Sequence, residues 1–179
     1  MSRDSATFSF SSDELRGPFS EKESCSDDTG YNIQGQICVL CAAIGAFVDR
    51  ASGRPGKVPA QIVRDLRFDQ PLPMEYLSRK ITLPAQEPER LTPFRVKEHE
   101  ADMYGHFNSN RSLDETMEYL PCGFKFNRLR LEYKAQARPG DLITPALYRN
   151  TPTPGGLTFT LSNESGLCTV FEFSTAPEK

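Results

Sequence analysis

The sequence predicts an α+β fold in which one helix packs against an antiparallel sheet. A helix-like segment at residues 108–120 follows a strand-like segment at Pro93–Glu98. Beyond the helix come four strand candidates whose short, turn-rich connections favour antiparallel pairing of neighbours. These candidates are Phe124–Arg138, Asp141–Arg149, Leu157–Leu161 and Leu167–Phe173.

The helix is predicted from its apolar spacing and from its ends. Leu113, Met117 and Leu120 recur at the i, i+4 and i+7 positions that share one helix face. Asn108 or Asn110 can cap its start, because a carboxamide oxygen accepts hydrogen bonds from the first free amides. A Pro-Cys-Gly stretch directly after Leu120 ends it.

Residues 1–30 are predicted to be a disordered acidic tail. They contain three basic residues, seven acidic residues and eight serines. Few of their side chains are large and apolar, so burial cannot offset the entropy of ordering them. No basic region precedes an apolar core, which argues against a signal peptide, and the acids argue against an organellar transit peptide. The expected location is therefore the cytoplasm.

The segment from residue 31 to residue 90 is predicted to hold short elements of a first half-domain. The apolar run Ile37–Val48 predicts a buried helix, since the breaker sequence Gly-Arg-Pro-Gly follows it. Lys57–Phe68 is compatible with a helix or a strand, and we favour a strand after Pro59. Glu75–Leu83 predicts a further short element.

Composition excludes several classes of protein. The chain has 179 residues, enough for a buried core, and a formal net charge of −3, which argues against nucleic-acid binding. Its longest apolar run is too short to span a bilayer. The five cysteines are predicted to be reduced thiols. Cys38 and Cys41 form a C-x-x-C among apolar neighbours, with no second pair at zinc spacing, so we favour buried core positions over a metal or redox site. We expect no metal and no cofactor.

The densest polar cluster runs from Glu98 to Asn110 and contains both histidines of the chain. It lies between a strand and a helix start, where free backbone amides can stabilise an oxyanion. A carboxylate and an imidazole beside such amides fit acid–base or acyl-transfer chemistry. The same residues also fit a local role, in which Asn108 caps the helix, Gly105 makes a turn and His106 hydrogen-bonds nearby. Composition alone leaves both interpretations open.

A family resemblance adds to this interpretation. Val96–Pro121 (VKEHEADMYGHFNSNRSLDETMEYLP) resembles the second hotdog domain of acyl-acyl-carrier-protein thioesterases, whose motif is approximately D-x-D-x-N-x-H-x-N-N. The matching acid, acid, histidine and asparagine are Glu100, Asp102, His106 and Asn108. Further matches are Glu118 and Pro121 at the helix end, Arg79-Lys80-Ile81 and Pro84 upstream, and the strand and R-x-G-D turn of Arg128–Asp141 (RLRLEYKAQARPGD).

The resemblance implies a hotdog fold, an antiparallel sheet wrapped around a central helix. Residues 91–179 would form the C-terminal hotdog domain, and residues 31–90 a reduced N-terminal hotdog-like segment. Because hotdog sites commonly lie between two hotdog units, the resemblance also implies a homodimer or an internal pseudo-dimer.

The resemblance implies catalytic roles for Asp102, His106 and Asn108, and substrate binding by Tyr104, Phe107, Ser109 and Gln136. Some positions depart from the family pattern. Tyr104 and Ser109 replace asparagines, Gln136 replaces the acid of the following strand, and Ala137 replaces a cysteine of the plant members. Gln136 can orient a water or a thioester but cannot act as a general base, and the bulk of Tyr104 is expected to fill part of the pocket.

The implied activity is hydrolysis of acyl-carrier-protein or acyl-CoA thioesters, in fatty acid biosynthesis and lipid metabolism. Two alternatives stay open. One is a catalytically degenerate hotdog protein that binds an acyl chain or a partner. The other is a hotdog enzyme of another reaction type, such as dehydration or cyclisation.

Two further groups of residues have both a functional and a structural interpretation. An acyl tunnel or an ordinary core would account for Leu113, Met117 and Phe126. The basic residues Arg128, Arg130, Lys134 and Arg138 form a stripe along one strand. This stripe is either a binding surface for phosphopantetheine or an acidic carrier protein, or simply a solvated strand face.

Overall fold

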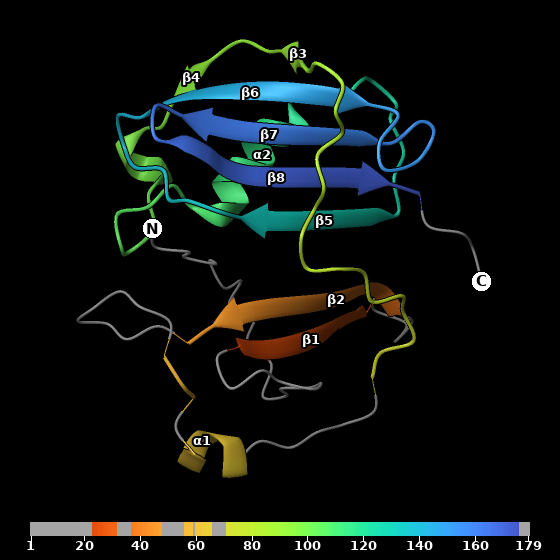
Figure 1. Ribbon diagram of the computed structural model, residues 1–179, viewed down its shortest axis with the longest axis vertical. Helices are drawn as coiled ribbons and strands as arrows, with labels where there is room; N and C mark the ends of the chain where they lie inside the picture. The colour runs from red at the N-terminus through yellow and green to blue at the C-terminus, as the bar shows by residue number, and fades with distance from the viewer. Residues whose placement is uncertain (1–22, 32–36, 48–55, 59, 66–70, 176–179) are drawn as a thin grey trace. The chain divides into compact units, whose positions relative to one another are not determined.

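The structure, a computed structural model of the chain, describes residues 23–31, 37–47, 56–58, 60–65 and 71–175. It divides into two compact units, Met1–Arg79 and Lys80–Lys179, each of which is described by itself (Figure 1). The boundary lies eleven residues before the predicted start of the second domain at residue 91, because residues 80–90 contact the second unit.

Unit 1 contains an antiparallel pair of strands and a short helix. Strand β1 (Glu23–Tyr31) pairs with β2 (Ile37–Ala46), and α1 spans Ala60–Asp65. The helix predicted for Ile37–Val48 is therefore wrong, as is the strand favoured after Pro59.

The pairing of β2 with β1 explains why the helix predicted for Ile37–Val48 is a strand. A short apolar run fits a buried strand as well as a buried helix, and the long-range pairing with β1 decides between them. Because β1 begins at Glu23, the predicted tail is also wrong for residues 23–30. Its first 22 residues lie outside the described part of the chain.

Unit 2 confirms the predicted α+β class. Its sheet has the strand order β3-β6-β7-β8-β5, and β4 also pairs with β6. Helix α2 (Ser109–Met117) lies against one face of this sheet (Figure 1). The remaining elements are β3 (Glu89–Arg90), β4 (Phe94–Arg95), the 3-10 helix η1 (Glu98–Glu100), β5 (Arg128–Tyr133), β6 (Leu142–Arg149), β7 (Leu157–Asn163) and β8 (Gly166–Ser174).

Strand β5 departs from the predicted succession of hairpins. β6 with β7 and β7 with β8 are hairpins, but β5 pairs with β8 instead of β6, in a register that places Leu131 opposite Phe171. The loop after β5 therefore crosses to the far edge of the sheet. This crossing brings residues 134–141 beside the polar cluster, through hydrogen bonds such as that from the Phe107 amide to the Ala137 carbonyl (2.7 Å).

The core between sheet and helix is built around aromatic rings. Phe159, Phe171 and Phe173 are completely buried. The Phe173 ring makes edge-to-face contacts with Phe126 (centroids 5.0 Å apart) and Phe159 (5.8 Å). Such pairs are favourable beyond the area that they bury, so Phe173 is the centre of the packed core.

Helix α2 presents a different face to the protein from the one predicted. Its fully buried residues are Ser112 and Thr116, whose hydroxyls donate to the carbonyls of Ser109 and Ser112 (both 2.7 Å). Leu113 is partly buried, whereas Met117 is 44% exposed. Met117 is therefore not a tunnel liner, and Phe126 packs in the aromatic core.

The opposite face of the sheet is crossed by the segment that leads to β3 (Figure 1). The Ile81 amide donates to Glu132 of β5 (2.9 Å). On the same strand Arg130 forms an ion pair with the buried Glu172 (2.7 Å), and Lys134 with Glu132 (2.7 Å). Two cations of the predicted basic stripe are therefore already neutralised by carboxylates.

The findings on cysteines, metal sites and membrane spans apply to the residues that the structure describes. Cys122 and Cys168 are free thiols, and Cys41 is half-buried on β2. In that same part of the chain, no group of three or more histidine, cysteine or acidic side chains has the arrangement of a metal site. None of the helices found there is long and apolar enough to cross a membrane.

Candidate functional site

A tight loop joins η1 to α2 and is built around the Asp102 carboxylate. Its Oδ1 atom accepts hydrogen bonds from the amides of Tyr104 (2.8 Å) and His106 (3.0 Å). The Asp102 amide in turn donates to the His106 carbonyl (2.8 Å). Gly105 has a φ of +76°, a left-handed conformation that glycine adopts without steric cost. The loop thus holds residues 102 and 106 at a fixed separation.

The Asp102 and His106 side chains face each other within this loop. Asp102 Oδ2 lies 4.0 Å from His106 Nδ1, and the two side chains are 32% and 25% exposed respectively. This distance is longer than a hydrogen bond, and a carboxylate that did accept from Nδ1 would leave Nε2 as the basic nitrogen. A shorter contact between the same two atoms would give an imidazole base oriented by a carboxylate.

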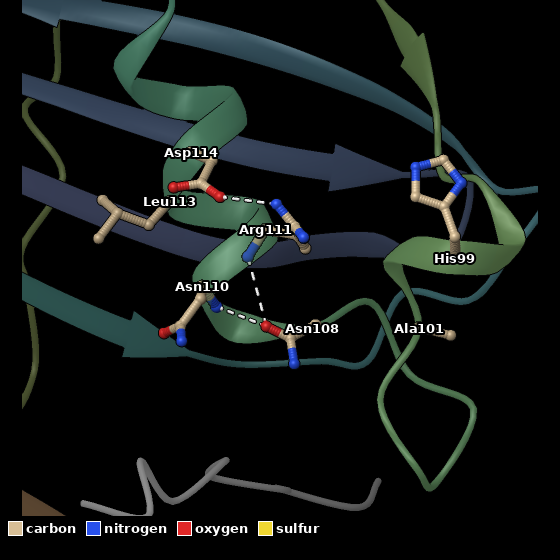
Figure 2. Close-up of a pocket in the computed structure, with 7 residues that line it drawn as sticks. All are labelled: His99, Ala101, Asn108, Asn110, Arg111, Leu113 and Asp114. Carbon is tan, nitrogen blue, oxygen red and sulfur yellow. Dashed lines mark hydrogen bonds and ion pairs between the residues drawn. The ribbon is translucent and has the colours of Figure 1, made fainter.

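Asn108 is the N-cap of α2. The sequence had predicted either Asn108 or Asn110 for this position. Its Oδ1 atom accepts from the amides of Asn110 (2.9 Å) and Arg111 (3.4 Å). Because the oxygen is held by the helix, the Nδ2 group points away from it, as Figure 2 shows. The side chain therefore serves the helix through its oxygen and offers an N–H donor outward.

Two of the backbone amides just before α2 already donate hydrogen bonds within the protein. The Phe107 amide donates to the Ala137 carbonyl (2.7 Å), and the Asn108 amide donates to the Glu100 carbonyl (2.8 Å). Within the described residues, no acceptor engages the Ser109 amide at the first position of α2. An oxyanion would accordingly meet Ser109 N–H and Asn108 Nδ2 instead of the Phe107 and Asn108 amides.

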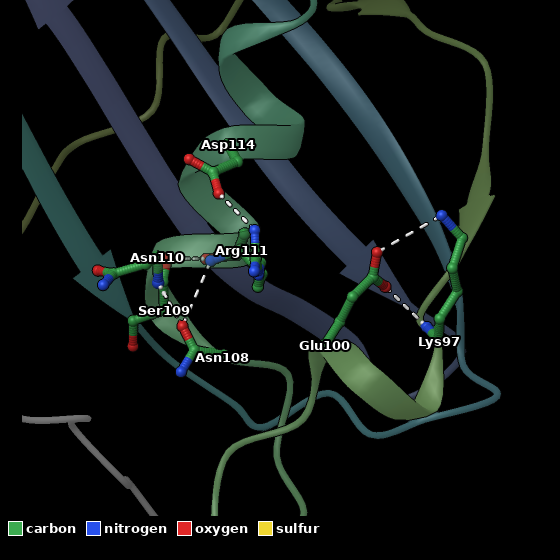
Figure 3. Close-up of polar contacts among 8 residues, drawn as sticks. Lys97, Glu100, Asn108, Ser109, Asn110, Arg111 and Asp114 are labelled. Atoms are coloured by element: carbon green, nitrogen blue, oxygen red, sulfur yellow. Dashed lines mark hydrogen bonds and ion pairs between the residues drawn. The ribbon is translucent and has the colours of Figure 1, made fainter.

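Glu100 anchors the start of the loop (Figure 3). Its side chain is 6% exposed, and its Oε2 atom accepts from the Lys97 amide (2.7 Å) while Oε1 lies 3.6 Å from Lys97 Nζ. Both carboxylate oxygens are thus directed back at Lys97. Glu100 corresponds to the first acid of the family motif, and here that acid has a structural role.

The four predicted substrate-binding residues lie in different surroundings. Tyr104 is 69% exposed and stacks on the His106 ring (centroids 6.4 Å apart), so the expectation that it fills the pocket is wrong. Phe107 packs into the core against Phe94. Ser109 is half-buried near Tyr133, whereas Gln136 is exposed in the loop after β5.

A surface pocket of about 640 Å³ lies beside this site (Figure 2). Of the seven predicted site residues, Asn108 alone lines it, among the residues that the structure describes. The other lining residues are His99, Ala101, Asn110, Arg111, Leu113 and Asp114. Of these six, the sequence predicted a possible tunnel position for Leu113 and placed His99, Ala101 and Asn110 in the polar cluster, and it gave no site role to Arg111 or Asp114. The predicted N-cap at Asn108 could have pointed to Asn110 and Arg111, because residues that follow an N-cap form the first turn of a helix, where backbone amides are free.

Tyr133 connects β5 to the first turn of α2. Burial raises the pKa of its hydroxyl from 10.0 to about 12, and the neighbouring Ser109 and Ser112 side chains act in the opposite direction. The neutral hydroxyl is thus the form that the folded protein favours. Tyr133 packs beneath the turn that carries the Asn108 cap.

The raised pKa of Tyr133 predicts a loss of stability at high pH. Above pH 10 the unfolded chain releases the phenol proton and the folded chain retains it, so the free energy of unfolding falls by up to about 1.4 kcal/mol per pH unit until about pH 12. Tyr133→Phe should remove this part of the slope. Urea unfolding of both proteins between pH 9 and pH 12 measures it, and identical slopes would contradict the assignment.

Comparisons with known proteins support the fold. No family model and no curated protein sequence matches the chain. Its fold is that of the hotdog thioesterases, as the sequence predicted. An acyl-ACP thioesterase from Bacteroides thetaiotaomicron superposes with a TM-score of 0.77 at 15% identity, covering 90% of this chain and 65% of that one.

Two further solved structures are similar to the chain. An oleoyl thioesterase from Lactobacillus plantarum has a TM-score of 0.70 at 16% identity, with 92% of this chain and 68% of that chain covered. The 12:0-ACP thioesterase from Umbellularia californica has a TM-score of 0.73 at 11% identity, with 92% and 66% covered. The chain thus spans about two thirds of the length of these structures.

Proposed function

We propose that the protein hydrolyses acyl thioesters of acyl carrier protein or coenzyme A. The observation that carries the proposal is the pair of Asp102 and His106, fixed by the loop and followed by the outward amide of Asn108. These groups supply a base, an orienting carboxylate and a hydrogen-bond donor, which are the parts that acyl transfer to water requires.

The proposed reaction uses these side chains together with the Ser109 backbone amide. His106 Nε2 takes a proton from a water molecule, whose oxygen attacks the thioester carbonyl carbon. The Ser109 amide and Asn108 Nδ2 donate to the carbonyl oxygen as negative charge develops on it. The carbon–sulfur bond then breaks, and the thiolate receives the proton from the imidazolium. Asp102 Oδ2 stabilises the charged imidazolium throughout.

A thiol-release assay tests the proposal. The full chain is incubated with acyl-CoA and acyl-carrier-protein substrates of several chain lengths, and free thiol is measured with a chromogenic reagent. Hydrolysis above the uncatalysed rate supports the proposal, and acyl binding without turnover would favour the degenerate alternative. The observation that favours the degenerate alternative is Gln136, which is exposed and stands where the family pattern has an acid.

Asn108 allows its two roles to be separated. Asn108→Ser retains a side-chain oxygen that caps α2 but removes the outward N–H donor, whereas Asn108→Ala removes both. We expect Asn108→Ser to lower kcat about 100-fold or more with a nearly unchanged Tm, and Asn108→Ala to cost about 1 kcal/mol of stability in addition. Equal activity of Asn108→Ser and wild type would show that Asn108 only caps the helix.

We also propose that unit 1 is a reduced counterpart of a first hotdog domain and that a second copy of the chain completes the active assembly. The described residues of unit 1 form a two-stranded sheet and one short helix, and an isolated two-stranded sheet is marginally stable, which supports this proposal. Light scattering of the full chain measures the mass directly, and a monomer that hydrolyses thioesters would refute the dimer.

A further inference from the structure

We propose that the pocket beside α2 binds the phosphopantetheine arm that acyl carrier protein and coenzyme A share, with Arg111 and His99 holding its phosphate. The inference rests on the proposed function for its substrate class. It adds a binding site in which Asn108 is joined by residues that the thioesterase resemblance did not implicate, His99, Arg111 and Asp114 among them.

The lining of the pocket matches the chemistry of this arm. Pantetheine carries two amides, a hydroxyl and a geminal dimethyl group, and its far end bears the phosphate. The carboxamides of Asn108 and Asn110 match the amides, and the Leu113 side chain offers an apolar surface. The volume of about 640 Å³ lies within the range of small-molecule sites.

The cationic groups of the pocket come from two separate elements. His99 belongs to η1 and Arg111 to the first turn of α2, and Figure 2 shows the two side chains extending into the space between these elements. A guanidinium binds phosphate through two parallel hydrogen bonds, and an imidazole adds a third donor. The pocket is therefore suited to a phosphate monoester or diester.

Arg111 can be recruited by a phosphate because its present partner is weak. Its Nη1 atom lies 3.3 Å from Asp114 Oδ2, and the two side chains are 58% and 63% exposed (Figure 3). Exposed pairs of this kind contribute little to stability. A phosphate replaces Asp114 as the partner of Arg111, and Asp114 opposes it by like-charge repulsion.

Asn108 joins the pocket to the proposed catalytic pair. It lines the pocket, and it lies two residues after His106 in an extended stretch of backbone. An arm whose thioester end lies at Asn108 therefore presents its carbonyl to the His106 side of the loop. The basic stripe on β5 is a poorer phosphate site, because Arg130 and Lys134 are already paired with Glu172 and Glu132.

Isothermal titration calorimetry of the full chain tests the site without requiring turnover. The probes are 4′-phosphopantetheine, pantetheine and coenzyme A. We expect 4′-phosphopantetheine to bind at least tenfold more tightly than pantetheine, Arg111→Gln to weaken it about 10- to 100-fold, and Asp114→Asn to strengthen it. Equal binding of the two probes, or no effect of Arg111→Gln, would overturn the proposal.

A matched surface ion pair provides the control. Arg149 and Glu89 lie 2.9 Å apart and are 53% and 52% exposed, so they resemble the Arg111–Asp114 pair in exposure. Arg149→Gln and Glu89→Gln should leave the binding of 4′-phosphopantetheine unchanged. If Arg149→Gln weakens binding as much as Arg111→Gln does, general charge and not the pocket is responsible, and the proposal fails.

Kinetics with two kinds of substrate distinguish the source of the arm. Arg111→Gln should raise KM for acyl-CoA or acyl carrier protein and leave it unchanged for N-acetylcysteamine thioesters, which lack the phosphate. The substrate with the larger change in kcat/KM is the one whose phosphate depends more strongly on Arg111. Binding without hydrolysis would support the pocket and refute the thioesterase proposal, whereas hydrolysis without phosphate-dependent binding would do the reverse.

Discussion

Replacing His106 with alanine is expected to lower thioester hydrolysis about 100- to 10,000-fold, the usual contribution of a general base. The backbone amide of residue 106 would still donate to Asp102 Oδ1, so the loop keeps its hydrogen bonds. The imidazole is partly exposed and leaves no large cavity. Stability should change little, and a thermal melt beside the thiol-release assay measures both effects.

Two further variants make the His106 result specific. Asp102→Asn retains an oxygen that accepts from the Tyr104 and His106 amides but removes the negative charge, so it should lower kcat while the loop stays intact. Glu164→Gln, an exposed change in the turn between β7 and β8, should leave activity at the wild-type level. Wild-type hydrolysis by His106→Ala would exclude His106 as the base.

Replacing Phe173 with alanine should have the largest effect on stability. The ring is completely buried and contacts Phe126 and Phe159, and deleting a buried phenyl group costs about 3–5 kcal/mol. That is a large part of the total stability of a domain, which is about 5–15 kcal/mol. Urea unfolding followed by circular dichroism gives the difference in free energy.

Phe173→Leu is the matched control for this core position. It keeps an apolar side chain and most of the volume, so it should cost clearly less than the alanine variant. Leu142→Ala, at a side chain that is 49% exposed, should change the free energy of unfolding by much less than either. Similar values for all three variants would show that the aromatic cluster does not dominate the core.

The second half of the fold could be predicted because its signals are local. The alternation of Leu129, Leu131 and Tyr133 marks a strand, and the asparagine before the helix marks its start. The first half could not be predicted in the same way. Ile37–Ala46 is a strand only because residues 23–31 pair with it, and no local pattern contains that information.

The candidate site could be predicted in part for a similar reason. The motif placed Asp102 and His106 together because they lie four residues apart in one loop. The pocket-lining side chains of His99 and Arg111 come together only when η1 and α2 are in place, so their proximity is a property of the fold. The exposed position of Tyr104 likewise depends on the left-handed turn at Gly105.

The pairing of β5 with β8 has a consequence for the order of folding. During synthesis β5 leaves the ribosome well before its neighbour, since β8 is the last strand of the sheet to be made. Until then Leu129 and Leu131 have no partner strand on that side, and the nascent sheet lacks its closing contact. Such non-local pairing slows folding, because a long loop must close before the contact forms. A nascent chain that ends before Gly166 therefore lacks the strand that pairs with Leu129 and Leu131.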